Sequence, residues 1–162
     1  MKRKTIVLLI IVMPLMIGMG CEKGIFNNDN NSKLNNTSWK LVGYTDDEGV
    51  FEPLTMPEQW KDTSYQVFFK EDTIYANMPN GKLNYGRYKA KKNGKLVLLD
   101  NRLFTDKSYG VLSDRFMYVL SKIYSYELSE NDLKLNSYEI NNKNEKHNIK
   151  MILKKIIHEN SK

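Results

Sequence analysis

The chain has very little of what most catalytic and metal-binding sites are made from. Its 162 residues include one cysteine and two histidines. A single cysteine cannot form an internal disulfide. Hydrolytic triads and zinc sites need a histidine beside a nucleophile or beside further ligands, and His147 and His158 have no such residue near them in the sequence. We therefore expect no catalytic residues, no bound metal and no cofactor.

Glycine-rich phosphate loops are absent as well. The sequence contains no Gly-x-Gly-x-x-Gly and no Gly-Lys-Ser/Thr motif, which argues against a nucleotide-binding enzyme. The acidic run Asp46, Asp47 and Glu48 precedes Gly49, but a calcium loop spreads its oxygen ligands over about twelve residues. The run therefore predicts a solvated turn.

Only one long apolar run is present, and it is too short for a transmembrane helix. It covers residues 5–17, is interrupted by Pro14, and falls short of the ~20 residues that span a bilayer. Three positive residues precede it, Lys2, Arg3 and Lys4, and small or unbranched residues follow at 18–20. This order is typical of a secretory signal, so residues 1–20 are predicted to be a signal peptide.

The lone cysteine comes directly after this signal, in the stretch "MIGMGCEK". The stretch resembles bacterial lipoprotein signals, in which small residues precede a lipidated cysteine that becomes the first mature residue. Gly18 and Gly20 are those small residues, although the family usually has leucine where Gly18 stands. The resemblance implies a lipid on Cys21, the membrane as a partner, and a place in the cell envelope, with the outer membrane favoured. The alternative is a soluble exported protein with a free thiol.

Charge and composition divide the rest of the chain into a tether and one domain. Residues 1–20 carry three of the 25 Lys and Arg residues, so the net charge falls from +6 to +3 when they are removed. A balance this modest favours solubility over nucleic-acid binding. The Asn-rich segment 22–36 has few apolar residues and is predicted to be a flexible tether after Cys21. Residues 37–157 form the single predicted domain, which we expect to be monomeric.

Alternating apolar residues predict that this domain is mainly β. Period-two segments recur at short intervals, and Asn80-Gly81 and Asn93-Gly94 are strong hairpin signals. Residues 113–122 instead have helical spacing, with Ser113 as the expected N-cap and Leu112 and Met117 as a hydrophobic staple. Residues 148–157 fit either a strand or a helix. The pattern predicts a small antiparallel barrel of about eight strands with one short helix.

The order of these segments resembles a known family. "TSWKLVGY", "YQVFFKEDTIYA", "NYGRYKA" and "GKLVLL" are followed by a helical segment and "YSYELSENDLKLNS", as in the META/HslJ-like family. The resemblance covers residues 37–155 and implies a barrel of lipocalin type. Members recur as small lipoproteins, and most have no established activity. This chain departs from the family in the long loop 46–62, which contains Trp60.

Three functions fit this sequence. The first is a non-enzymatic binding or structural role, in which loops meet an envelope or exported protein and Trp60 contacts that partner. Trp60 could instead be a lid residue over the barrel mouth. The second is a lipocalin-like carrier of a small apolar ligand, although we expect aromatic side chains to fill the barrel. The third is an inhibitor of an exported protease that presents Asn77–Lys82 as an extended loop. Lysines interleaved with Tyr85 and Tyr88 superficially resemble an RNA-binding sheet, but we expect no nucleic-acid partner for an exported chain.

Overall fold

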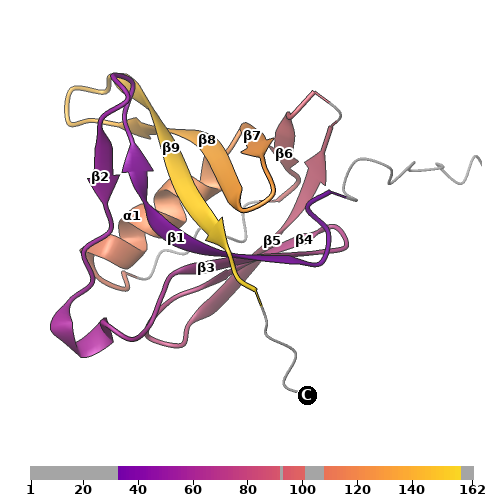
Figure 1. The fold of residues 1–162 in the computed structure, drawn as a ribbon. Coiled ribbons are helices and arrows are strands. Elements are labelled where there is room, and N and C mark those ends of the chain that lie inside the picture. The colour runs from indigo at the N-terminus through magenta and orange to yellow at the C-terminus, as the bar shows by residue number, and fades with distance from the viewer. Residues whose placement is uncertain (1–32, 92, 101–107, 158–162) are drawn as a thin grey trace, which may run out of the picture.

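The computed structural model describes residues 33–91, 93–100 and 108–157. Within these residues the chain forms one antiparallel sheet with a single α-helix, α1 (Val111–Ser121), and a short 3-10 helix, η2 (Glu58–Trp60) (Figure 1). The strands are β1 (Thr37–Thr45), β2 (Phe51–Pro53), β3 (Gln66–Lys70), β4 (Thr73–Asn77), β5 (Leu83–Ala90), β6 (Leu96–Leu98), β7 (Ser125–Leu128), β8 (Asp132–Ile140) and β9 (Lys146–Lys155). Their order is β6-β5-β4-β3-β1-β9-β8-β7, and β2 pairs with β1 outside this path.

The two ends of this strand order meet, so the sheet nearly closes into an eight-stranded barrel. Lys95, just before β6, forms a bridge with Ser125 at the start of β7. The amide of Leu96 donates to the carbonyl of Tyr124 at 3.0 Å, and the amide of Tyr126 donates to the carbonyl of Gly94 at 2.7 Å. We call this short contact the seam. The predicted fold class, a small antiparallel barrel with one helix, is confirmed.

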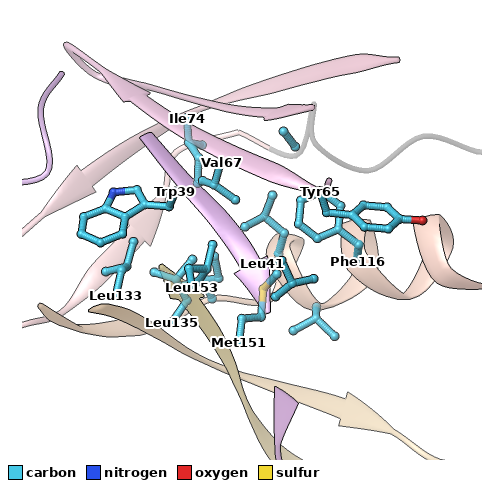
Figure 2. Close-up of a cluster of buried hydrophobic side chains, with 14 of the residues drawn as sticks. Trp39, Leu41, Tyr65, Val67, Ile74, Phe116, Leu133, Leu135, Met151 and Leu153 are labelled. Atoms are coloured by element: carbon cyan, nitrogen blue, oxygen red, sulfur yellow. The ribbon is translucent and has the colours of Figure 1, made fainter. Parts of the chain in front are cut away.

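Side chains at alternate positions fill the barrel, as a strand with one buried face requires. On β1, Trp39 and Leu41 point inward, while Lys40 between them is exposed. Side chains from both walls and from α1 meet in one core (Figure 2). The rings of Tyr65 and Phe116 have centroids 5.0 Å apart, and those of Phe69 and Tyr88 are 5.1 Å apart. The largest fully buried side chains are thus aromatic residues that pack against one another: Trp39, Tyr65, Tyr88, Phe69 and Phe116.

The C-terminal segment that fitted two interpretations is a strand. β9 buries Ile149, Met151 and Leu153, which alternate along the chain. It lies between β8 and β1 and pairs with both of them, so its backbone groups are used in two ladders. A helix here would have left β1 and β8 without a common neighbour.

The start of α1 differs from the prediction. The N-cap is Gly110, with a φ of 95°, and its position makes no side-chain cap hydrogen bond. The predicted N-cap, Ser113, instead lies buried in the first turn with its hydroxyl 2.9 Å from that of Tyr65. Asp114 places a negative charge in the first turn, and its carboxylate accepts a hydrogen bond from the amide of Tyr109, just before the helix, at 2.8 Å. With the helix beginning at Val111, the staple predicted for Leu112 and Met117 is wrong as well.

Four hairpin turns share one geometry. In residues 46–50, 78–82, 91–95 and 141–145, the first amide donates to the last carbonyl, and the fourth amide donates to the first carbonyl. The fourth residue has positive φ in each turn and is Gly49, Gly81, Gly94 or Asn144. This is a tight turn followed by a bulge residue in the left-handed conformation. Both Asn-Gly hairpins predicted from the sequence are confirmed.

The folded part begins earlier than predicted. Leu34 is fully buried, and the hydroxyl of Thr37 donates to its carbonyl. The Asn35 side chain accepts a hydrogen bond from the amide of Glu71 at 2.6 Å. The predicted boundary between tether and domain, after residue 36, is therefore too late. Cys21 and the signal segment lie outside the described residues.

The barrel has two ends with different contents. The proximal end contains Leu34, the turn between β3 and β4, and the end of β9, where the amide of Lys155 donates to the carbonyl of Asn131. The distal end contains the hairpins 46–50 and 141–145, the loop 54–65 and the start of α1. Both ends of the folded part are thus proximal (Figure 1). Among the described residues, no helix combines the length and apolar character needed to cross a bilayer.

Candidate functional site

The distal end is the part of the barrel where long connections gather. β1 runs from the proximal end to the distal end and continues into hairpin 46–50. The carboxylate of Asp47 in this hairpin accepts a hydrogen bond from the amide of Asn148 at 3.0 Å. That contact ties hairpin 46–50 to β9, three residues after hairpin 141–145 ends.

An arginine on α1 ties this end together. The Arg115 guanidinium donates to Glu52 on β2 at 2.8 Å and to Glu139 on β8 at 2.9 Å. It also lies over the ring of Tyr44 on β1, 4.4 Å from the centroid. One cation thus joins α1 to β8 and to the neighbouring strands β1 and β2, which lie far from both in the sequence. Nothing in the sequence singles out Arg115, because a single charge in an amphipathic helix is expected to face solvent.

The electrostatics of this cluster indicate a structural tie. Partial burial opposes the charged form of Arg115, but the hydrogen bonds that it donates to Glu139 and Glu52 outweigh burial and raise the pKa of the guanidinium. Burial likewise raises the pKa of Tyr44, although Arg115 opposes that shift. Arginine and tyrosine therefore keep their protons at neutral pH.

Apolar side chains are exposed where the two hairpin turns join their strands. Val50, at the end of turn 46–50, is 60% exposed, and Phe51, the first residue of β2, is 49% exposed. Ile140, the last residue of β8 before turn 141–145, is 49% exposed. Single exposed apolar residues are ordinary on a protein surface, but these three lie at the same end of the barrel.

Trp60 lies in the loop 54–65 at the same end. It closes the short helix η2, and its carbonyl accepts hydrogen bonds from the amide and hydroxyl of Thr63 at 2.9 and 2.7 Å. Its side chain is half-buried. Leu54 and Met56, earlier in the loop, pack against the core. The loop is therefore an ordered platform, and partner contact by Trp60 stays a prediction.

The polar residues considered for chemistry are placed apart from one another. His147 is exposed, with its Nε2 atom 2.9 Å from the side-chain Nδ2 atom of Asn141. His158 lies outside the described residues. Asp46 accepts hydrogen bonds from the amides of Glu48 and Val50 at 3.0 and 2.8 Å, so the acidic run is the turn that was predicted. Within the described ranges, no group of three or more His, Cys, Asp or Glu side chains could hold a metal ion.

The segment proposed as a protease-binding loop is compact. The amide of Met78 donates to the carbonyl of Lys82 at 2.9 Å, which closes a tight turn between β4 and β5. Met78 is itself only 1% exposed. The prediction of an extended loop at Asn77–Lys82 is therefore wrong. Strands β4 and β5 pair up to this turn and leave no free segment to enter a cleft.

Comparison with known proteins identifies the fold and goes no further. No protein-family model matches the chain, and no curated protein matches it in sequence. A crystal structure of a DUF4847 family protein from Bacteroides vulgatus is similar, with a TM-score of 0.50 and 15% identity over 75% of this chain and 95% of that one. An NMR structure of a protein from Burkholderia xenovorans has a TM-score of 0.52 and 14% identity over 82% and 90%. Identities this low indicate a shared barrel architecture alone.

Proposed function

We propose that this protein is an exported lipoprotein with a non-enzymatic binding role, held in the cell envelope by a lipid on Cys21. One observation carries the proposal. The chain's single cysteine follows directly after a charged, apolar and small-residue segment typical of a lipoprotein signal. Each buried methylene of an acyl chain contributes about 0.8 kcal/mol, so two or three chains on one residue hold a protein on a membrane durably.

The arrangement of the barrel fits such an anchor. The folded part begins at Leu34 on the proximal end. A tether that arrives there leaves the distal end, with Trp60 and the two hairpins, free to meet another envelope protein. A carrier role has less support, because buried aromatic side chains pack together inside the barrel, Tyr65 with Phe116 and Phe69 with Tyr88. The compact turn at residues 78–82 gives the inhibitor role no support.

Replacing Cys21 by serine tests the anchor. We expect the wild-type protein to fractionate with membranes and to have an acylated N-terminal cysteine by mass spectrometry. The Cys21→Ser variant is expected to lose the acyl mass and remain unprocessed, because serine has no thiol to carry the thioether-linked lipid. Glu22→Gln, one residue away, is the control and should be acylated like the wild type. An unmodified thiol on a soluble wild-type chain would refute the proposal.

Replacing Trp60 by alanine tests the binding role. We expect affinity capture from detergent-solubilised envelope to recover a partner with the wild type and to recover at least about tenfold less with Trp60→Ala, since buried tryptophans are frequent interface hot spots. Ile157→Ala is the matched control, because Ile157 is 74% exposed but lies at the proximal end. Equal recovery with Trp60→Ala would remove this loop from the binding surface.

A further inference from the structure

An aromatic ladder crosses the outside of the barrel on three neighbouring strands. Phe68 on β3 is the register partner of Tyr75 on β4, which is the partner of Tyr85 on β5. Partners in an antiparallel sheet point to the same side, and the neighbours of these residues along each strand point inward. Tyr85 is 47% exposed, and Leu83, two residues before it, is 55% exposed. We call this outer surface of β3, β4 and β5 the aromatic wall.

Cations flank the ladder on both sides. On each side of the ladder runs a parallel row of outward-facing side chains from the same strands. The row on the distal side begins with Lys40 on β1, whose register partner is Gln66 on β3. The row on the proximal side begins with Lys70 on β3. Both lysines are exposed, and neither has an ion-pair partner among the described residues. Arg87 closes the proximal row and is paired with Asp72 at 2.8 Å.

The charge of the chain is concentrated on the same half of the barrel. Among the described residues, 64–91 and 93–99, which include β3 to β6, contain six Lys or Arg and two acidic residues. The other described residues, 33–63, 100 and 108–157, contain 11 Lys or Arg and 13 acidic residues. The half that contains the aromatic wall is therefore strongly positive, and the other half is slightly negative. A positive face of this kind is attracted to an anionic surface.

The start of the folded part lies beside the aromatic wall, which places the wall near the proposed lipid anchor at Cys21. Asn35 contacts the turn between β3 and β4 through its hydrogen bond with Glu71. That turn lies at the proximal end of the strands that form the aromatic wall. Residues 22–32 join Cys21 to the folded part, and eleven residues reach at most about 40 Å even when fully extended. The wall is thus within reach of the bilayer that holds the lipid.

We propose that the aromatic wall lies on the membrane surface, with its tyrosines at the headgroup level and its lysines against anionic lipid phosphates. Tyrosine is enriched at membrane interfaces, because its ring is apolar and its hydroxyl is polar. A lysine near an anionic bilayer contributes about 1 kcal/mol of binding. This inference rests on the proposed lipid anchor and adds an orientation to it. The distal end, with Trp60, then remains uncovered by the membrane.

Vesicle binding by a chain without lipid tests the wall independently of the anchor. The protein is the mature chain from residue 21 with Cys21→Ser, and the probe is phosphatidylcholine vesicles with about one third phosphatidylglycerol. We expect partitioning into these vesicles at low salt, and much weaker partitioning into pure phosphatidylcholine. Adding Lys40→Gln and Lys70→Gln should weaken partitioning roughly tenfold or more. The double variant Tyr75→Ser with Tyr85→Ser should weaken partitioning several-fold, although its net charge equals that of the parent.

The opposite wall provides the matched control. Lys134 and Tyr138 point outward from β8, and Lys134→Gln with Tyr138→Ser should leave partitioning unchanged. The proposal would be overturned if the protein did not bind anionic vesicles, or if the control pair lost as much binding as the wall variants. Either result would leave the acylation of Cys21 untouched, because the vesicle test uses a chain without lipid. If the tyrosine variant binds like the parent, or if soluble dextran sulfate binds as well with no need of the tyrosines, the wall is a general polyanion site and the membrane assignment fails.

Discussion

Replacing Trp39 by alanine is expected to lower the free energy of unfolding by about 3–5 kcal/mol, which is the range for truncating a large buried aromatic residue. Trp39 is only 1% exposed and lies on β1, the strand that joins the two halves of the sheet. Its register partner on β3 is Val67, and on its other side β1 pairs with β9. The cavity would therefore open in the core beside these central strands, among the side chains that Figure 2 shows around Trp39.

The hydrogen bond of Trp39 allows packing and polar effects to be separated. Its indole nitrogen donates to the hydroxyl of Thr37 at 2.7 Å, and that hydroxyl donates to the carbonyl of Leu34. Trp39→Phe keeps most of the apolar volume and removes the indole donor with one ring, so we expect a cost of about 1–2 kcal/mol. Urea unfolding of the mature chain measures both variants. Equal losses for alanine and phenylalanine would show that the hydrogen bond, rather than core filling, accounts for the effect.

The strands could be predicted because each one has a buried and an exposed face. In β5, Tyr88 and Ala90 are buried while Tyr85 and Arg87 are exposed, which is the alternation that the sequence shows. The sequence alone could not decide whether the segment of β9 is a strand or a helix, because its apolar residues also match helical spacing. Pairing with β1 and β8 settles the matter, and those partners lie far away in the sequence.

Local signals failed where distant contacts take over the same groups. Ser113 has the chemistry of an N-cap, but its hydroxyl is paired with that of Tyr65, 48 residues away. Leu34 is one apolar residue in an Asn-rich run, so composition assigned it to the tether, yet it is fully buried in the core. In both cases the side chain is fixed by tertiary packing, which overrides local propensity.

The aromatic wall could not be found by scanning the sequence. Phe68, Tyr75 and Tyr85 belong to three different strands, and each one alone looks like an ordinary half-exposed residue. The register of β3, β4 and β5 is what aligns them. The sequence did contain one relevant signal, the lysines around Tyr85, but it grouped Tyr85 with Tyr88, which is buried. The placement of Cys21 and Trp60 as functional residues still depends on the sequence interpretation and on the experiments proposed above.

Replacing Gly94, which lies at the seam, by alanine is expected to cause the second large loss of stability. This residue has a φ of 77°, and a Cβ atom added to it would lie 2.8 Å from the carbonyl oxygen of Tyr126. The same two residues make the 2.7 Å hydrogen bond that brings β7 to β6. Gly94→Ala must therefore strain the backbone and also push β7 away from β6. We expect a total loss of about 2–4 kcal/mol in the free energy of unfolding, of which the left-handed conformation accounts for 1–2.

Gly81 is a matched control that the chain itself provides. It occupies the same position in the same type of Asn-Gly turn, with a φ of 74°, but nothing lies within 4 Å of an added Cβ. Gly81→Ala should therefore cost only the backbone strain of about 1–2 kcal/mol. Hydrogen exchange adds a local readout: the amides of Leu96 and Tyr126, which form the seam, should exchange faster in Gly94→Ala and at the parent rate in Gly81→Ala. Equal destabilisation by the two variants would mean that closure of the barrel at the seam contributes nothing to its stability, and that the sheet is held by its other pairings alone.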